Sequence, residues 1–404
     1  MEYYAKSKET ELSEREKNNL REKLENLADD LEGDLDEKEQ QVVLRELENL
    51  LKQNICNHKT VKEHTDDAVR CAEDFFSKYG KNFSEFEKEL VLEACRLHDL
   101  GKVNIIFQIG VNQALKSKMP SHLLKVRQVP HGFLSAVSIS MEELKENCKI
   151  LTIDDFSAFI TAVYYHHARE DEWEDGDIKK FAEDYYLPCL EWYSGEKRGV
   201  FLSNRDKLLF RNNPDSENRI KNHKQWNAYV LIKGLLNKFD YTVSAGYEQA
   251  EFLPDLEKKT LKQNIERVFS GMELRPAQKY MKDNSGKTEA ALLWLDGEKG
   301  FYTLPLQVSS NAIYDRIKDK YSFYDVSLLH SDSMRKYLEE DVGRDTSAYE
   351  NYENAKRLAY PLTVCTIDQL FKFVYKALGT EIFAATLKYS KIILDEIQSY
   401  KIPF

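Results

Sequence analysis

The sequence is poor in glycine and proline and contains no closely spaced pair of cysteines. Its 404 residues include 16 Gly and 9 Pro, about half of the usual share, which favours long helices over loop-rich folds. The six cysteines are scattered without a Cys-x-x-Cys motif, so neither a disulfide framework nor a zinc ribbon is indicated. This cysteine usage fits a reducing compartment, and we expect a cytoplasmic protein.

Long hydrophobic runs are also absent from the sequence. The longest apolar stretches, such as residues 290–295, are far shorter than the roughly 18 residues of a membrane span. The first residues lack the apolar core of a secretory signal. We therefore expect no membrane partner.

Positive charge is not in excess. The net charge is −11, which argues against nucleic-acid binding if the charge is spread evenly. The first 53 residues, however, hold 9 Lys and Arg against 16 Asp and Glu. Most of the acidic excess therefore lies in one N-terminal segment, which leaves room for a basic groove elsewhere in the chain.

The sequence pattern divides the chain into three parts. Residues 1–53 predict an acidic helical segment that packs on the next domain, and we assign no chemistry to it. Residues 54–246 show helix after helix, one of them opened by the capping-box sequence Thr60-Val61-Lys62-Glu63. Residues 247–404 alternate helical stretches with short runs of β-branched and aromatic residues, which predicts βα units on a parallel sheet. The predicted strands are 300–304, 327–330, 362–366 and 391–394.

Histidines are concentrated in the predicted helical domain. Five of the nine occur there at predicted helix ends or starts, namely His64, His98, His131, His166 and His167. Taken singly, each histidine is most simply a core or surface residue whose hydrogen bonds are satisfied. Imidazoles and carboxylates together, however, are the ligand set for Mn, Fe, Ni, Co or Zn. Neighbouring helical residues diverge by about 100°, so His98 and Asp99 can approach one ion from two sides or let the carboxylate bridge two ions. A dinuclear centre of this kind indicates phosphate-ester hydrolysis.

Five motifs in a fixed order carry a resemblance to a known family. They are His64; His98-Asp99-Leu100-Gly101-Lys102 with Phe107-Gln108; His131-Gly132-Phe133-Leu134-Ser135; Tyr165-His166-His167; and Asp240-Tyr241-Thr242-Val243-Ser244. In this order they resemble the HD nuclease domain of the CRISPR-associated type I interference nuclease-helicase family. The resemblance extends over essentially the whole chain. It implies a multidomain fold in which an all-α HD-type domain precedes a partial α/β RecA-like helicase lobe with a parallel sheet.

The resemblance also implies the roles of individual residues at a centre of two divalent transition-metal ions, Mn, Fe, Ni or Co. One ion would be held by His64, His98, Asp99 and Asp240. The second would be held by His131, His166 and His167, with Asp99 between the two. Asp99 and Lys102 would be catalytic, the Lys102 ammonium lying beside the scissile phosphate, where a cation suits an anionic transition state. The alternative for Lys102 is a lysine that interacts with the dipole at a helix C-terminus.

A phosphate-binding pattern lies in the second half of the chain. Ser285-Gly286-Lys287-Thr288 resembles the end of a Walker A loop, in which Lys287 would reach the β/γ-phosphates and Thr288 would ligate Mg²⁺. Asp395 and Glu396 follow the last predicted strand as a Walker B-like element that would hold Mg²⁺ and orient water. With Gln278 as an adenine-reading glutamine, the series resembles the first motor lobe of superfamily 2 helicases.

Three features predict that this helicase part is inactive. A full loop needs glycine five residues before Gly286, where the sequence has Met281. Gln278 lies only eight residues before Gly286, too close for the preceding strand. The sequence stops eight residues after Glu396, so we expect the first helicase lobe to be incomplete and the second lobe to be absent from this sequence. A partner chain could supply the second lobe. Mg-ATP is expected only if the loop is functional. A truncated product, a fragment and one half of a split protein stay open as alternatives.

Together these patterns predict a metal-dependent DNase that cleaves single-stranded DNA exposed by a CRISPR surveillance complex, with the substrate following from the resemblance alone. Two alternatives stay open. One is an HD phosphohydrolase acting on nucleotides, which shares the ligand chemistry, and the other is a degenerate, non-catalytic fragment. A long groove with basic or aromatic walls favours a polymer, whereas a closed pocket favours a nucleotide.

Overall fold

The computed structural model describes most of the chain after the N-terminal segment. The described residues are 59–111, 123–149, 151–167, 172–209, 223–252, 260–270, 287–341, 348–373 and 379–400. They form two compact units. The first contains the described residues between 59 and 250 together with 379–385, and the second contains those between 251 and 373 together with 386–400. The predicted helical segment 1–53 lies outside the described residues, as do Gln278 and Gly286 of the predicted ATP site.

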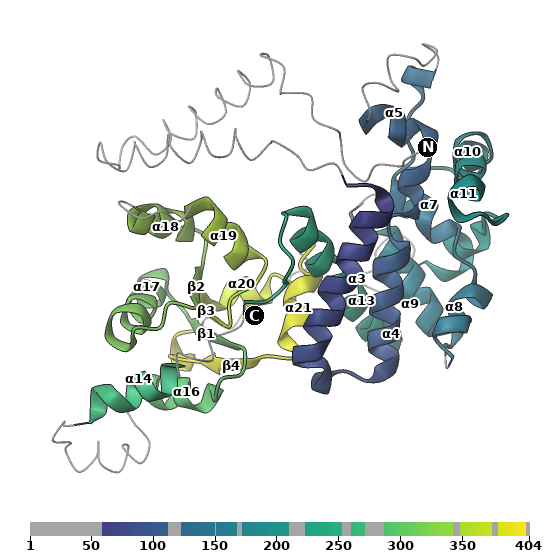
Figure 1. Cartoon of the computed structure of the whole chain (residues 1–404). Helices are drawn as coiled ribbons and strands as arrows, with labels where there is room; N and C mark the ends of the chain where they lie inside the picture. Colours follow the sequence, from purple (N-terminus) through teal and green to yellow (C-terminus); the bar gives the residue numbers. More distant parts are fainter. Residues whose placement is uncertain are drawn as a thin grey trace. The chain divides into compact units, whose positions relative to one another are not determined.

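The first unit is built from helices, coloured purple to teal in Figure 1. They are α3 (Val61–Tyr79), α4 (Glu85–Leu97), α5 (Ile105–Val111), α7 (His131–Val137), α8 (Met141–Asn147), α9 (Ile153–Tyr164), α10 (Asp175–Phe181), α11 (Leu187–Ser194) and α13 (His223–Ser244). The unit also includes residues 381–385 of α21 (Glu381–Leu387).

Capping boxes determine where the principal helices begin. At α3 the Thr60 hydroxyl accepts a hydrogen bond from the Glu63 N–H, and the Glu63 carboxylate accepts one from the Thr60 N–H. The capping box predicted from the sequence is thereby confirmed. Equivalent boxes open α4 at Ser84 and α9 at Thr152. Each box satisfies backbone donors that the helix itself leaves unpaired, and the first one places His64 in the first turn of α3.

Helix α13 is the centre of the first unit's core. It packs against α3, α4 and α9 and is buried along most of its length, from Trp226 to Val243. Phe239 of α13 meets Phe75 of α3 edge to face, with ring centroids 5.3 Å apart. The neighbouring residue on α13, Asp240, is only 2 % exposed. Burial of this helix therefore carries a carboxylate into the interior of the unit.

The second unit contains a four-stranded parallel sheet with strand order β2-β3-β1-β4. The strands are β1 (Gly300–Leu304), β2 (Val326–Leu329), β3 (Leu362–Thr366) and β4 (Lys391–Leu394). Three of the predicted strands are confirmed as written. The predicted strand 327–330 begins and ends one residue earlier, because its ladder with β3 runs from the pair Val326–Leu362 to the pair Leu329–Cys365. His330 therefore lies just beyond the strand.

Helices accompany the sheet in the alternating pattern that the sequence predicts. They are α14 (Thr260–Phe269), α16 (Lys287–Leu295), α17 (Gln307–Asp315), α18 (Ser333–Asp341), α19 (Ala348–Lys356) and α20 (Ile367–Phe371). Of these, α17 and α19 pack directly on the strands. None of the helices in the described ranges combines the length and the apolar character needed to cross a membrane.

Candidate metal centre

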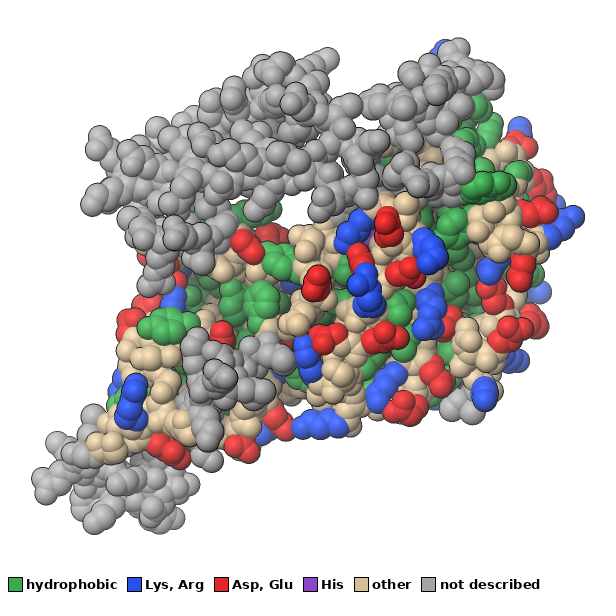
Figure 2. All heavy atoms as spheres, in the orientation of Figure 1, with side chains coloured by type: hydrophobic (Ala, Val, Ile, Leu, Met, Phe, Trp, Pro, Cys, Tyr) green, Lys and Arg blue, Asp and Glu red, His purple; other side chains and the backbone are tan. Residues whose placement is uncertain are grey.

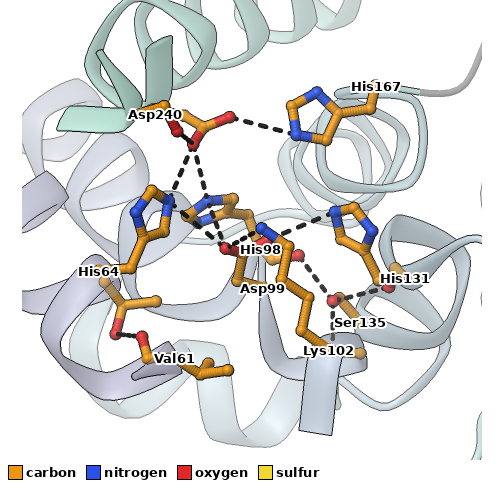
Figure 3. A network of polar contacts seen from close by, with 12 residues as sticks. Val61, His64, His98, Asp99, Lys102, His131, Ser135, His167 and Asp240 are labelled. Carbon is orange, nitrogen blue, oxygen red and sulfur yellow. Dashed lines mark hydrogen bonds and ion pairs between the residues drawn. The ribbon is translucent and has the colours of Figure 1, made fainter. Parts of the chain in front are cut away.

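The predicted ligand residues converge within the first unit (Figure 3). His64 comes from the first turn of α3, and Asp240 comes from the last turns of α13. His98 is the C-terminal cap of α4 and Asp99 follows it. His131 begins α7, and His166 and His167 follow the end of α9. Because most of these positions are helix ends, small changes in helix length would change which side chains face the centre.

The Asp99 carboxylate lies between two groups of histidines. Its Oδ2 atom is 3.5 Å from Nε2 of both His64 and His98. Its Oδ1 atom is 3.4 Å from Nε2 of His131 and 4.0 Å from Nε2 of His166. The Asp99 side chain is fully buried. One carboxylate thus presents a different oxygen to each group.

Two groups of residues have the spacing needed to hold a metal ion. In each group the available ligand atoms all lie within 4.8 Å of one another, and the groups are His64, His98 and Asp99, and His131, His166 and His167. Asp240 adjoins both groups, with Oδ1 2.9 Å from Nε2 of His64 and Oδ2 3.2 Å from Nε2 of His167. Nitrogen and carboxylate oxygen in this combination suit Mn, Fe, Ni, Co or Zn.

Hydrogen bonds to the backbone set the tautomers of two histidines. Nδ1 of His98 lies 3.0 Å from the carbonyl oxygen of Cys95, and Nδ1 of His166 lies 2.6 Å from that of Val163. A carbonyl oxygen can only accept, so each Nδ1 carries the proton and each neutral ring presents the Nε2 lone pair to the centre. Among the described residues, Nε2 of His98 and Oδ1 of Asp99 are buried without a hydrogen-bond partner. Unpaired buried acceptors are rare, and a divalent cation is the kind of group that satisfies them.

The environment keeps His131, His166 and Asp99 in the protonation states that metal binding requires, whereas it favours the protonated form of His98. Burial lowers the pKa of His131 to about 3 and lowers the pKa of His166 well below its usual value. Burial alone would raise the pKa of Asp99, but His98 and Lys102 outweigh it and hold that pKa far below its usual value. Burial opposes the charged form of His98 as well, yet Asp99 and Asp240 raise its pKa overall.

Lys102 belongs to the same cluster. It lies on the short 3₁₀ turn η2 (Leu100–Val103) that follows Asp99, and its ammonium Nζ is 2.7 Å from Oδ2 of Asp99. The residue is only 7 % exposed. Its charge is therefore directed at the Asp99 carboxylate and away from solvent.

Sequence reasoning did not assign a role to Ser135, which ties two parts of the centre together. The Ser135 hydroxyl accepts a hydrogen bond from the Gly101 N–H at 2.8 Å and donates toward the carbonyl oxygens of His98 and His131, at 2.6 and 2.9 Å. The backbone of Gly101 lies very close to that of His131, because a Cβ atom at Gly101 would lie 2.0 Å from the His131 carbonyl oxygen. The signal in the sequence is the four-residue spacing of His131 and Ser135, which places both on one face of α7.

The described residues of the predicted ATP site lie in the second unit. Lys287 begins α16, and Oγ1 of the buried Thr288 is 3.4 Å from Nη1 of Arg316. The Tyr302 hydroxyl on β1 donates to Oδ2 of Asp395 at 2.6 Å, and the Glu396 N–H donates to Oδ1 at 2.9 Å. Each oxygen of Asp395 thus accepts one hydrogen bond, which holds the carboxylate in place at the end of β4.

Comparison with known proteins identifies the helical unit. Residues 50–235 match the family model described as "Cas3, HD domain". This segment of the chain is similar to the Cas3 HD domain. The resemblance inferred from the ordered motifs is therefore confirmed, and the residues of the two histidine groups from His64 to His167 all fall inside the matched segment.

Curated relatives extend the match toward the second unit. The "CRISPR-associated nuclease/helicase Cas3" of Methanothermobacter thermautotrophicus is 25% identical over 421 residues, covering 86% of this chain and 50% of that protein. The "Putative CRISPR-associated nuclease/helicase Cas3" of Methanocaldococcus jannaschii is 34% identical over 128 residues, covering 29% of this chain and 18% of that protein. The chain thus spans about half the length of the first relative.

Solved structures show the same fold. The crystal structure of T. fusca Cas3-ATP superposes with a TM-score of 0.52 at 15% identity, covering 85% of this chain and 46% of that one. The crystal structure of T. fusca Cas3 gives the same TM-score and identity, covering 83% and 44%. The predicted fold class, an all-α HD-type domain followed by an α/β lobe with a parallel sheet, is confirmed.

Proposed function

We propose that the chain is a metal-dependent nuclease that cleaves phosphodiester bonds of single-stranded DNA in CRISPR type I interference. The observation that carries this proposal is the Asp99 carboxylate, buried between two histidine groups with one oxygen toward each. The curated relatives bear the name nuclease/helicase, which supports the reaction class. The choice of single-stranded DNA, and of a surveillance complex as the source of that strand, rests on the family resemblance. The proposed cytoplasmic location rests on the cysteine usage.

In this proposal the two groups hold two divalent transition-metal ions. His64, His98, Asp99 and Asp240 bind the first, and His131, His166 and His167 bind the second, with Asp99 shared. Such ions supply an activated water and neutralise the charge that develops on the phosphate. The protein residues hold the geometry: His98 and His166 keep their Nδ1 protons on backbone carbonyls, and Ser135 joins the turn after Asp99 to the start of α7.

A polymer substrate is supported by the open side of the centre. His167 is the most exposed of the proposed ligands, with a side chain 38% exposed. The ring of Tyr241 lies nearly parallel to it, at 15° and 6.1 Å between centroids, and this residue is 36% exposed. Aromatic surfaces beside a catalytic centre stack the bases of single strands in a sequence-tolerant way. We therefore place the approach of the DNA strand on the side of His167 and Tyr241.

The face formed by α3 and α4 is a poorer path for DNA. Figure 2 shows Lys and Arg side chains interspersed with Asp and Glu over this face, and several form ion pairs, such as Lys62 with Asp66 and Lys88 with Glu85. Paired charges of opposite sign produce little net field to attract phosphates.

For the remaining parts of the chain we keep the assignments made from the sequence. Residues 54–246 are the proposed nuclease domain, 247–404 an incomplete helicase lobe, and 1–53 a helical segment without chemistry. We propose that the lobe does not turn over ATP. Support comes from Met281, where the phosphate loop needs glycine.

The experiment is a cleavage assay with the purified full chain. The wild-type protein should cut single-stranded DNA in the presence of Mn²⁺ or Ni²⁺ without ATP. Asp99→Ala should abolish cutting. Asp184→Ala, which changes an exposed carboxylate of the same unit, is the control and should still cut. Intact DNA together with hydrolysis of nucleotides would favour the phosphohydrolase alternative. Intact DNA with no hydrolysis of either would favour the non-catalytic alternative. Robust DNA-stimulated ATP turnover would contradict the proposal for the helicase lobe.

A further inference from the structure

We propose that Lys102 is an internal counter-ion of the metal-free centre, and that its ammonium must leave Asp99 when a divalent cation binds. This inference rests on the proposed metal-dependent function.

The position of the ammonium is the first reason. Nζ of Lys102 lies 2.7 Å from Oδ2 of Asp99, the same oxygen that faces Nε2 of His64 and of His98 at 3.5 Å. Figure 3 shows the lysine side chain extending toward this carboxylate among the histidines. The ammonium thus occupies the oxygen that the proposed first metal ion would use.

Charge balance is the second reason. Among the described residues, the ion-pair partners of Asp99 are His64, His98, His131, His166 and Lys102. Of these partners Lys102 is the nearest, with Nζ at 2.7 Å from Asp99, whereas the histidine nitrogens lie at 3.4 to 4.0 Å. A buried carboxylate without a compensating charge is strongly destabilising. Lys102 therefore supplies positive charge where a metal ion would otherwise supply it.

The Lys102 ammonium and a divalent cation exclude each other from the Asp99 carboxylate for an electrostatic reason. A dication and an ammonium that share one carboxylate oxygen in a low-dielectric interior repel each other strongly. The backbone of Lys102 is held in place, because its N–H donates to the Asp99 carbonyl at 2.9 Å and its carbonyl accepts from Nε2 of Gln108 at 2.7 Å. Only the flexible side chain can yield. Metal binding would then release the ammonium for a substrate phosphate, so that metal loading and presentation of Lys102 become one event.

The first experiment compares metal affinity in two lysine variants of the full chain. Lys102→Met removes the counter-ion. Lys233→Met removes a similarly buried lysine, whose Nζ is 2.8 Å from Oε1 of Glu381 in the same unit, and serves as the matched control. Both variants should lower the melting temperature of the metal-free protein. In titration calorimetry with MnCl₂, only Lys102→Met should bind more tightly, with a Kd at least about tenfold lower than that of the wild type.

The second experiment needs no variant. Acetylation of wild-type lysines by an amine-reactive reagent, followed by mass spectrometry, should find Lys102 protected without metal and several-fold more reactive with MnCl₂. Unchanged or weaker Mn²⁺ affinity in Lys102→Met, or unchanged reactivity of Lys102 when calorimetry shows that Mn²⁺ is bound, would overturn the counter-ion role and leave the nuclease proposal standing. Absence of Mn²⁺ binding in both the wild type and Lys102→Met would instead refute the metal centre itself.

Discussion

The carboxylate of Asp240 on α13 lies 2.9 Å from Nε2 of His64 on α3, although 176 positions separate the two residues. The other oxygen of Asp240 reaches Nε2 of His167 at 3.2 Å. Asp240 therefore connects the two histidine groups, as Asp99 does through its own two oxygens. The packing of α13 against α3 and α9 brings these side chains together.

This bridging position makes Asp240 a sensitive test of the centre. Asp240→Asn keeps the size of the side chain and an oxygen acceptor but removes the negative charge that attracts a cation. We expect the affinity for Mn²⁺ to fall by about 10–100-fold, measured by calorimetry, while circular dichroism shows that the variant remains folded. An unchanged Kd would exclude Asp240 as a ligand.

The contact between Gly101 and the His131 carbonyl predicts that no side chain is tolerated at this glycine. A Cβ atom would lie 2.0 Å from a backbone oxygen, which cannot move aside as a flexible side chain can. Gly101→Ala should lower the free energy of unfolding by about 1–3 kcal/mol or more and displace His131 from Asp99. Gly110→Ala is the control, because nothing lies within 4 Å of a Cβ there. That variant should be neutral or gain up to about 1 kcal/mol, both changes being measured by urea unfolding.

The stability of the metal-free protein should depend on pH through the buried histidines. Histidines of the unfolded chain take up protons below about pH 6.5, whereas burial lowers the pKa of His131 to about 3 and that of His166 well below its usual value. The unfolded state therefore binds more protons, and the free energy of unfolding falls as pH decreases, by at most about 1.4 kcal/mol per pH unit for each histidine. The pKa of His98 is raised, so the stability that its protonated form contributes is lost only as the pH rises above about 6.5.

The measurement is urea unfolding in EDTA at about pH 6 and about pH 5 for the wild type and His166→Gln. The variant should lose less stability between the two values because one of the suppressed protonations is gone. Equal losses would mean that His166 does not contribute to the pH dependence.

In the second unit, a buried ion pair should be essential for stability. Nζ of Lys299 lies 2.5 Å from Oε2 of Glu251 and 2.7 Å from the carbonyl oxygens of Leu358 and Tyr360, and both charged side chains are almost completely buried. Lys299→Met leaves the Glu251 carboxylate buried without its cation, which typically costs about 3–5 kcal/mol. Lys62→Met removes an exposed partner of Asp66 and should cost less than about 1 kcal/mol. Calorimetric unfolding of the two variants distinguishes these outcomes.

Local features of the structure could be predicted from the sequence because they depend on neighbouring residues. The capping box at Thr60 needs only a hydroxyl and a carboxylate three positions apart, and it forms as predicted. The strand from Gly300 to Leu304 is a short run of apolar and β-branched residues, and its bounds are confirmed. Where pairing sets the bounds, as for the strand before His330, the prediction was wrong by one residue, since the ladder with β3 decides which residues pair.

The sequence by itself determined which residue types are available for the centre, their order along the chain, and their positions at helix ends. Only the tertiary structure decided that one oxygen of Asp99 faces each histidine group, that Lys102 lies on that carboxylate, and that Ser135 joins the turn after Asp99 to α7. The physical reason is that spacing along a helix determines the direction of a side chain relative to its own axis, whereas distances of a few ångströms between atoms on different helices depend on how α3, α4, α7, α9 and α13 pack together.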